Sequence, residues 1–488
     1  MNALTNGLAQ VPDNTGQWLL ASAAVLLLGG CASVQRVASP SPGIDIPPNW
    51  SAADAASVSG ASSLVQWWAR FDDPVLNRVV LEAARANNSI KSAQAALRQA
   101  RALRDVAAAG LAPVVGSSAS AQRSKSAGNS PGNSFNVGLD ASWELDVFGA
   151  NRSAANASQA TAQASAATLG NTQVSVAAEV ALAYISLRSA QVRLAIASDN
   201  LASQQDTLQI TLWRLQAGLV TELESEQARA SSAQTAAQLP ALQTAIEANS
   251  HALAVLAGQP PAALLATLAA TGPMPQAQAG LALDIPANTL RQRPDVRAAE
   301  LQVMAASANV AQADAALLPN FKLGGSLGLN ALKLGELASG AAVFGSLLAS
   351  VSLPLFNGGA LRAQVRAQQA ALDQAQLAYQ AAVLVALKDV EDALVALRGD
   401  QLRQTSLQQA AIAAANAATL ARQRYDSGLI DFSVVLETQR TRLGSQDAVA
   451  SAGADVTADH VRLYKALGGG WQPGVGELAS ATGSSALP

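Results

Sequence analysis

Two stretches of the chain, residues 150–217 and 360–425, are each expected to form one helix with a single glycine inside it. At 1.5 Å per residue, each helix would be about 100 Å long. Such helices do not fit inside a compact globule, so they must form a coiled coil, a fibre or the wall of a tall assembly. In the second stretch, one helical face is marked by apolar residues at steps of three, four or seven positions: Leu361, Val365, Leu372, Tyr379, Val383, Val390, Leu394 and Leu397.

The composition suits long helices that pack closely. Half of the 488 residues are hydrophobic, but only 4% are aromatic and 13% are charged. Alanine makes up the difference, and alanine is the best helix former and lets backbones approach one another. A net charge of −3 gives no basic surface for nucleic acid. Two histidines, one cysteine and three methionines leave almost nothing for a metal site or a histidine-based triad, so we expect no cofactor and no enzyme.

The sequence contains two copies of one plan. Residues 85–113 align without a gap on residues 291–319, at an offset of 206. Residues 214–219 (RLQAGL) match residues 424–429 (RYDSGL), at an offset of 210. Matches in the same order at a nearly constant offset indicate an internal duplication.

Each copy is expected to contain a helix, two strands, a very long helix, a tight turn and a returning helix. Pro240 should bend or segment the first returning helix. The expected bounds in the first copy (64–258) are strands at about 113–123 and 134–146, the long helix at 150–217 and the return at 221–257. Those in the second copy (286–468) are strands at about 319–330 and 343–356, the long helix at 360–425 and the return at 431–467. Residues 259–285 link the copies, and residues 469–488 form a tail.

The expected strands alternate between apolar and polar residues. Segments of about ten residues with this period are typical of transmembrane β-strands, although a half-buried soluble sheet shows the same period. The aromatic residues at strand ends and the lipid signal described next favour the membrane. The apolar face comprises Phe135, Val137, Leu139, Ala141, Trp143 and Leu145 in one strand, Phe321, Leu323, Gly325, Leu327 and Leu329 in another, and Val343, Gly345, Leu347, Ala349, Val351, Leu353 and Leu355 in a third.

The N-terminus resembles a bacterial lipoprotein signal. Residues 18–28 form an apolar run that is too short to span a bilayer but suits a signal peptide, and the run leads directly to Leu28-Gly29-Gly30-Cys31. In a lipoprotein this cysteine receives a diacylglycerol, residues 1–30 are removed, and the new N-terminus is acylated. Residues 31–63 then form a tether rich in Ser, Pro, Gly and Ala. The alternative is that Cys31 is a buried free thiol.

The chain as a whole resembles the outer membrane efflux proteins of the TolC type, in particular their lipid-anchored NodT/OprM-like branch. The resemblance implies a mainly α-helical protein with a membrane β-barrel. Three protomers would each give four strands to one twelve-stranded barrel, which continues into an α-helical tunnel across the periplasm. The motifs that carry the resemblance are the segment ending at Cys31, residues 143–149 (WELDVFG), 291–297 (RQRPDVR), 318–321 (LPNF) and 354–358 (PLFNG), and the two Arg-x-x-x-Gly-Leu turns.

The two Arg-x-x-x-Gly-Leu turns are expected at the end of the tunnel farthest from the barrel. A glycine with positive φ ends a helix and leaves the next residue on an exposed tip. In the family such tips dock a periplasmic adaptor protein. The alternative is a simple helix-to-helix turn, which needs the glycine but not the shared arginine. The residues are Arg214, Gly218 and Leu219 in one turn and Arg424, Gly428 and Leu429 in the other.

Asp431, Glu437 and Arg440 follow the second turn. In the family, an acidic residue nine positions beyond the tip glycine helps to narrow the closed channel, and Glu437 matches that position. A second acidic position of the family is Val434 here. Three copies of Glu437 around an axis would repel one another unless each is paired with Arg440, which gives a latch. The alternative is a solvated surface pair worth under about 1 kcal/mol.

Three functions are consistent with these features. The first is the outer membrane channel of a tripartite efflux pump, a passive conduit that works with a periplasmic adaptor and an inner-membrane RND or ABC transporter to export small molecules. The second is the same architecture in type I protein secretion. The third is a structural periplasmic lipoprotein without a pore. The chain has no G-x-x-x-x-G-K-[ST] loop that could supply energy from nucleotide hydrolysis.

Overall fold

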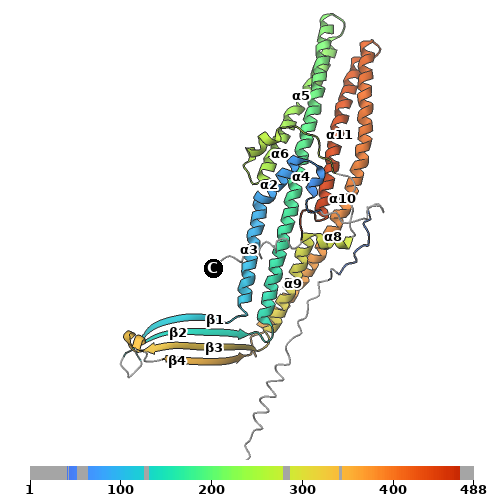
Figure 1. Ribbon diagram of the computed structural model, residues 1–488. Helices are drawn as coiled ribbons and strands as arrows, with labels where there is room; N and C mark the ends of the chain where they lie inside the picture. The colour runs from blue at the N-terminus through green and yellow to red at the C-terminus, as the bar shows by residue number, and fades with distance from the viewer. Residues whose placement is uncertain are drawn as a thin grey trace, which may run out of the picture. The chain divides into compact units, whose positions relative to one another are not determined.

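The computed structural model describes residues 41, 43–51, 64–125, 131–277, 286–339 and 343–472. The chain divides into a unit Met1–Pro40, which lies outside the described residues, and a unit Ser41–Pro488, which contains every element described below. Figure 1 shows these elements in chain order.

The first half of the unit begins with a short 3-10 helix and ends with a pair of helices. Its elements are η1 (Trp67–Phe71), α2 (Pro74–Ala86), α3 (Asn88–Ala109), β1 (Val114–Ser124), β2 (Gly132–Leu145), α4 (Ala150–Gln216), α5 (Glu222–Ala236) and α6 (Gln238–Leu256). Two short helices then lead away from α6: η2 (Pro261–Leu264) and α7 (Leu265–Leu268).

The second half repeats this order up to a single returning helix. Its elements are α8 (Pro286–Gln292), α9 (Pro294–Ala315), β3 (Asn320–Ala331), η3 (Leu334–Ser339), β4 (Val343–Ser352), α10 (Ala360–Asp426) and α11 (Phe432–Ala466). Both α4 and α10 contain 67 residues and run unbroken through the glycines inside them.

The two halves match element by element. Both α3 and α9 have 22 residues and start 206 positions apart, and α4 and α10 start 210 positions apart. The first helix expected in each half is in fact two helices, α2 and α3 or α8 and α9, separated at Asn87 and at Arg293. Asn87 breaks the chain because its side chain accepts hydrogen bonds from the amides of Ser89 and Ile90, and Pro294 fills the first helical position after Arg293.

Pro240 explains why the first returning helix is split into α5 and α6. The break falls at Ala237, three residues before the proline. A proline ring collides with the carbonyl four residues earlier, here that of Ala236, the last residue of α5. The second returning helix, α11, has no proline and runs unbroken for 35 residues.

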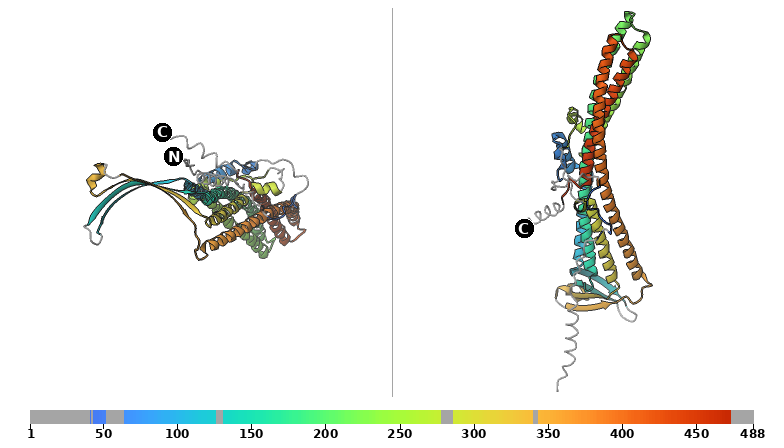
Figure 2. Two further views of the ribbon diagram at one scale, coloured as in Figure 1. Left: turned by 90° about the horizontal axis from the view of Figure 1, so that it is seen from below. Right: turned by 90° about the vertical axis from the view of Figure 1, so that its right-hand side faces the viewer.

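The four strands form one antiparallel sheet in the order β1-β2-β3-β4. The register places apolar residues opposite one another, as in the pairs Val137–Leu329 and Trp143–Leu323. Because neighbouring side chains in a strand alternate between faces, one face of the sheet is apolar. The sheet curls, as Figure 2 shows from below, and β1 and β4 are its two unpaired edges.

The opposite face of the sheet is polar and carries hydrogen bonds across the strands. Ser118 Oγ donates to Asp140 Oδ2 at 3.0 Å, and Asn320 Nδ2 donates to Glu144 Oε1 at 2.5 Å. Further along, Asn330 Nδ2 donates to Asn136 Oδ1, and the hydroxyls of Ser326 and Ser346 lie 2.7 Å apart.

Phe344 is an aromatic residue on this polar face. Its ring covers Gly328, where a Cβ atom would lie 2.7 Å from the ring. The glycine therefore makes room for the ring.

The helices join the sheet at one end of α3, α4, α9 and α10 (Figure 1). α4 packs on α3, α9 and α6, and α10 packs on α11 and α9. A core forms where η1 and α2 meet the middle of α4 and the end of α11. There the ring of Trp67 stacks on that of Tyr464 with centroids 5.4 Å apart.

The middle of α4 carries a buried polar network. Arg188 is 5% exposed; its Nε donates to Tyr184 Oη at 2.9 Å and its Nη1 donates to the carbonyl of Ala270 at 2.6 Å. Tyr184 in turn donates to Asp73 at 2.8 Å, and burial raises the pKa of Tyr184 to about 12. The network attaches the segment after α7 to the side of α4.

Part of the expected tether packs on the second half. Trp50 is 7% exposed and lies in a cluster with Val390 and Leu463. The amide of Ser51 donates to Glu391 Oε1 at 2.7 Å. The described residues 43–51 are thus attached to α10, while Cys31 lies outside the described residues.

Candidate functional site

The turn between α4 and α5 and the turn between α10 and α11 have the same geometry. Gly218 has φ of +72° and Gly428 has φ of +70°, so the predicted positive φ is confirmed at both. The amide of Leu219 donates to the carbonyl of Arg214 at 2.8 Å, and that of Leu429 to Arg424 at 2.9 Å. This arrangement ends each long helix and leaves Leu219 and Leu429 74% and 73% exposed.

The two arginines of these turns have different surroundings. Arg214 Nη2 lies 3.1 Å from Asp426 Oδ1, and its guanidinium carbon lies 5.1 Å from the centre of the Tyr425 ring. Arg214 therefore connects the end of α4 to the end of α10. Among the described residues, the side chain of Arg424 makes no hydrogen bond or ion pair.

An apolar cluster supports the turns from below. The rings of Tyr425 and Phe432 lie 5.2 Å apart, and Phe432 is 1% exposed. The other buried members of the cluster are Ala228, Ala421, Val435 and Leu436, so α5, α10 and α11 share it. The tip is therefore a packed unit and not a pair of frayed helix ends.

The structure brings together two of the three expected gate residues. Arg440 Nη1 lies 3.2 Å from Glu437 Oε2, and the two side chains are 60% and 67% exposed. Asp431 is instead the residue before the first turn of α11, where its carbonyl accepts from the amide of Val434 at 3.1 Å. A carboxylate there interacts favourably with the helix dipole. No hydrogen bond or ion pair joins Asp431 to Glu437 or Arg440 in the described structure.

Lower down, an ion pair links α4 to α11. Arg193 donates to both oxygens of Asp447, at 2.6 and 3.0 Å. The hydrogen bond to Asp447 raises the pKa of Arg193. A planar guanidinium that meets a carboxylate with two parallel bonds fixes orientation as well as distance.

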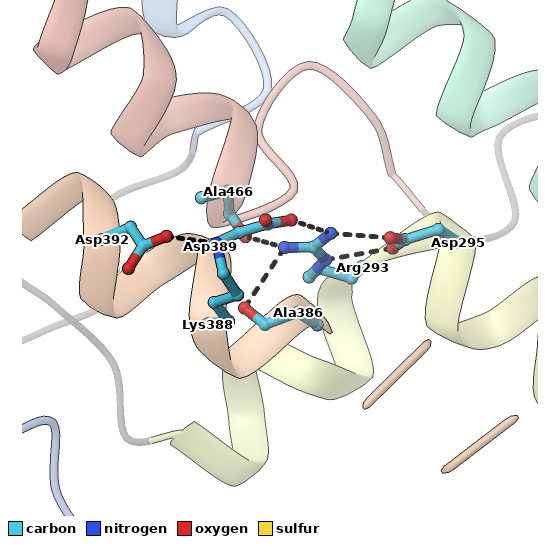
Figure 3. A network of polar contacts seen from close by, with 7 residues as sticks. All are labelled: Arg293, Asp295, Ala386, Lys388, Asp389, Asp392 and Ala466. Carbon is cyan, nitrogen blue, oxygen red and sulfur yellow. Dashed lines mark hydrogen bonds and ion pairs between the residues drawn. The ribbon is translucent and has the colours of Figure 1, made fainter. Parts of the chain in front are cut away.

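Arg293 anchors α10 to α9 and α11 near the middle of the helices (Figure 3). Its side chain is 8% exposed and lies 2.6 Å from Asp295 Oδ2 and 3.0 Å from Asp389 Oδ2. It also donates to the carbonyl of Ala466 at 3.0 Å. Burial raises the pKa of Asp295, but the hydrogen bond and charge of Arg293 outweigh this effect, so the pKa lies below its usual value.

Sequence reasoning identified the tip turns but missed the residues that join them. Asp426 and Tyr425 lie inside the RYDSGL turn, and their charge and ring complement Arg214. The sequence also did not indicate that Arg193 and Asp447 join α4 to α11, or that Arg293 joins α10 to α9 and α11. Among the described residues, no group of three or more His, Cys, Asp or Glu side chains is arranged to hold a metal ion.

A curled, two-faced sheet that continues into helices of about 100 Å defines the class of outer membrane channel proteins. The sequence model of the outer membrane efflux protein family matches residues 79–259 and 285–469, one match for each half. The chain belongs to this family.

Several curated relatives match nearly the whole chain. The pyoverdine export outer membrane protein OpmQ of Pseudomonas putida is 33% identical over 449 residues, which is 89% of this chain and 94% of OpmQ. The toluene efflux pump outer membrane protein TtgF of Pseudomonas putida is 31% identical, over 83% of this chain and 86% of TtgF.

Solved structures share the fold. The outer-membrane channel OprN matches with a TM-score of 0.82 and 36% identity, covering 89% of this chain and all of OprN. VceC of Vibrio cholerae matches with a TM-score of 0.78 and 27% identity, covering 84% of this chain and 99% of VceC. The predicted fold and family are confirmed, and the chain is an outer membrane efflux protein.

Proposed function

We propose that three copies of this chain form one passive conduit across the outer membrane and the periplasm. The observation that carries the proposal is the open sheet with unpaired edges at β1 and β4. An unpaired edge cannot face lipid, because its amides and carbonyls would have no partners. Since β1 and β4 run in opposite directions, β4 of one copy can pair with β1 of the next, and three copies close a barrel of twelve strands.

The two faces of the sheet support the same assembly. All four strands have at least ten residues, enough to cross a bilayer when tilted. The apolar face would meet lipid, and the polar face with its cross-strand hydrogen bonds would line the lumen. The long helices would continue the lumen as a tunnel.

The tip turns would carry the gate and the docking surface. Glu437 and Arg440 form a latch whose ion pair is exposed and so can be undone at a cost under about 1 kcal/mol. Arg214, Leu219, Arg424 and Leu429 would meet a periplasmic adaptor, because Leu219 and Leu429 are apolar and mostly exposed. Asp431 belongs to this proposal only as the residue that starts α11.

Cys31 would carry the lipid. A diacylglycerol and an N-acyl chain together bury enough methylene groups, at about 0.8 kcal/mol each, to hold the N-terminus in the membrane. The described residues 43–51, which pack on α10, would then attach that anchor to the helices.

The substrates would be small organic compounds, and the chain would catalyse no reaction. Two relatives are named for two different compounds, pyoverdine and toluene. A conduit does not have to discriminate between them when an inner-membrane pump selects the cargo and supplies the energy. The partners would be that pump and its adaptor.

Conductance of the purified protein in planar bilayers tests the proposal. Wild-type protein should form a channel that is mostly closed, and Glu437→Ala or Arg440→Ala should raise the open fraction. Gels of unheated and heated samples should show a trimer that dissociates on heating. A monomer in detergent with no conductance in any variant would refute the conduit.

A further inference from the structure

A polar cavity of about 280 Å³ lies between α4, α10 and α11, on the sheet side of the tip turns. Asn200 and Gln204 of α4 line one side, and Arg422 and Asp426 of α10 line another. Gln439 and Arg442 of α11 complete it. These residues are distinct from the pair Glu437–Arg440, and none of them has a role in the proposed function.

The cavity has a positive charge that the protein does not neutralise. Among the described residues, neither Arg422 nor Arg442 forms an ion pair or a hydrogen bond through its side chain. Asp426 is the only carboxylate in the lining, and it is already paired with Arg214. Arg422 and Arg442 are half-buried, so an anion in the cavity would be attracted by two guanidinium groups that are only partly screened by water.

Several polar atoms around the cavity are buried without a partner. Gln204 is 4% exposed, and among the described residues neither its Oε1 nor the buried Oε1 of Gln439 accepts a hydrogen bond. Arg442 Nε is buried and donates to no acceptor. Leaving each such atom unpaired costs about 1–3 kcal/mol, so the clustering of three at one cavity indicates a bound species that satisfies them.

We propose that this cavity binds a small oxyanion such as sulfate or hydrogen phosphate. Arg422 and Arg442 would donate to its oxygens, since the guanidinium fork matches a planar or tetrahedral oxyanion. The carbonyl oxygens of Gln204 and Gln439 would accept from ordered water or from the hydroxyl of hydrogen phosphate. The anion would thereby join α10 to α4 and α11. It would lie close to the ion pair of Arg214 with Asp426, which connects α4 and α10 directly.

The bound anion would cross-link the helices near the tip and stabilise their closed arrangement. In the proposed conduit, an anion that binds Arg422 of α10 and contacts Gln204 of α4 through water opposes any movement of the end of α10 away from α4. The regulatory effect rests on the proposed gate, but the binding itself does not. Binding is therefore measured separately from conductance.

Hydrogen exchange on the purified full-length protein tests the binding, with sodium sulfate compared with sodium chloride at equal ionic strength. A ligand that binds only the closed tip slows exchange by 1 + [L]/Kd, so sulfate at ten times its Kd should slow the last turns of α10 about tenfold. Arg422→Gln and Arg442→Gln should each abolish the effect. Arg366→Gln, an exposed arginine at the far end of α10, is the matched control and should retain it.

Two further arms identify the ligand. Phosphate should act like sulfate, whereas a stronger effect of acetate would assign the site to a carboxylate and overturn the assignment to a free tetrahedral anion. Equal exchange in sulfate and chloride would show that the cavity holds only water and would also overturn the proposal. These outcomes are independent of whether the protein conducts ions.

Discussion

The long helices α4 and α10 are equal in length, but other helices of the same protomer bury much more of α4 than of α10. α4 has more than twice as many buried residues as α10, although both contain 67 residues. α3, α5, α6, α9 and α11 all pack on α4, whereas α10 packs mainly on α9 and α11. Duplication therefore produced two similar helices, of which one is the core of the protomer and the other is at its surface.

The uncovered face of α10 is apolar. Among large hydrophobic residues of α4, only Trp213 is exposed, at 60%. On α10 seven are more than half exposed: Leu377, Leu384, Val385, Val395, Leu402, Ile412 and Leu420. A surface of this kind marks an interface, so the second copy of the duplication is the half that requires a neighbour.

The largest effect is expected for a charge placed in the covered helix. Ala181 of α4 is 0% exposed and lies in the cluster with Trp67 and Tyr464. Ala181→Asp would bury a carboxylate without a partner, which costs several kcal/mol. We expect no protease-resistant protein in the outer membrane fraction. Normal accumulation of the folded protein would show that α4 is not the core of the protomer.

A charge on the uncovered helix should separate folding from assembly. Leu384→Asp changes a residue that is 54% exposed, so the protomer should keep its helical circular dichroism but lose the trimer on unheated gels. Gln369→Asp, at an exposed polar position of α10, is the control and should retain the trimer. An intact trimer in Leu384→Asp would place the interface elsewhere.

A substitution of Arg293 would measure how strongly its contacts within the protomer stabilise the packing of α10. Arg293→Met leaves Asp295 and Asp389 without their cation and should lower the free energy of unfolding by about 3 kcal/mol. Arg297→Met, which breaks the pair of the 46% exposed Arg297 with Glu300 on the same helix, should cost less, about 1 kcal/mol. Urea unfolding followed by tryptophan fluorescence would measure both.

The same substitution should change the pH dependence of stability. The pKa of Asp295 is lowered in the folded state. Its pairing with Arg293 therefore contributes fully to the free energy of unfolding above the usual pKa of 3.8, and this contribution is lost as the pH falls through the lowered pKa. Wild-type protein should therefore lose stability below about pH 4 more steeply than Arg293→Met. Parallel curves for the two proteins would contradict this role.

The smallest effect is expected at the tip, where α4 and α10 meet directly. Arg214 and Asp426 are 30% and 52% exposed, so their coupling in a double-mutant cycle of Arg214→Gln and Asp426→Asn should be under about 1 kcal/mol. The conductance of Arg214→Gln should nevertheless show more openings than wild type. Arg424→Gln, which lacks this contact, should behave as wild type in the absence of an adaptor.

Sequence periodicity predicted the long helices closely because local residues set their ends. The expected ranges 150–217 and 360–425 compare with Ala150–Gln216 and Ala360–Asp426. The glycines at the tips, with positive φ, terminate the helices whatever lies around them. The strand faces followed from alternation in the same way, except that Phe344 lies on the polar face.

What the sequence did not predict depends on contacts between distant segments. The reason for the glycine inside α4 lies in a distant segment: a Cβ at Gly170 would lie 2.3 Å from Trp471 Nε1, so the indole of Trp471 packs where a side chain would be. The pairing of Arg214 with Asp426 likewise requires α4 and α10 to end at the same height. Neither relationship has a local signal.

The close approach of Trp471 to Gly170 has a counterpart at the other end of the described chain. A Cβ on Gly43 would lie 3.0 Å from Gln380 Nε2. Gly170 and Gln380 each lie twenty residues after the start of their long helix, about 30 Å from the sheet. Gly43 and Trp471 thus pack at equivalent points of the two halves, and in the proposed assembly both points would lie on the periplasmic side of the sheet. Among the described residues, η3 lies at the end of the sheet away from the helices (Figure 1) and would reach the cell exterior. An epitope inserted in η3 would therefore be detected on intact cells, whereas one placed beside Gly43 or Trp471 would require a permeabilised outer membrane.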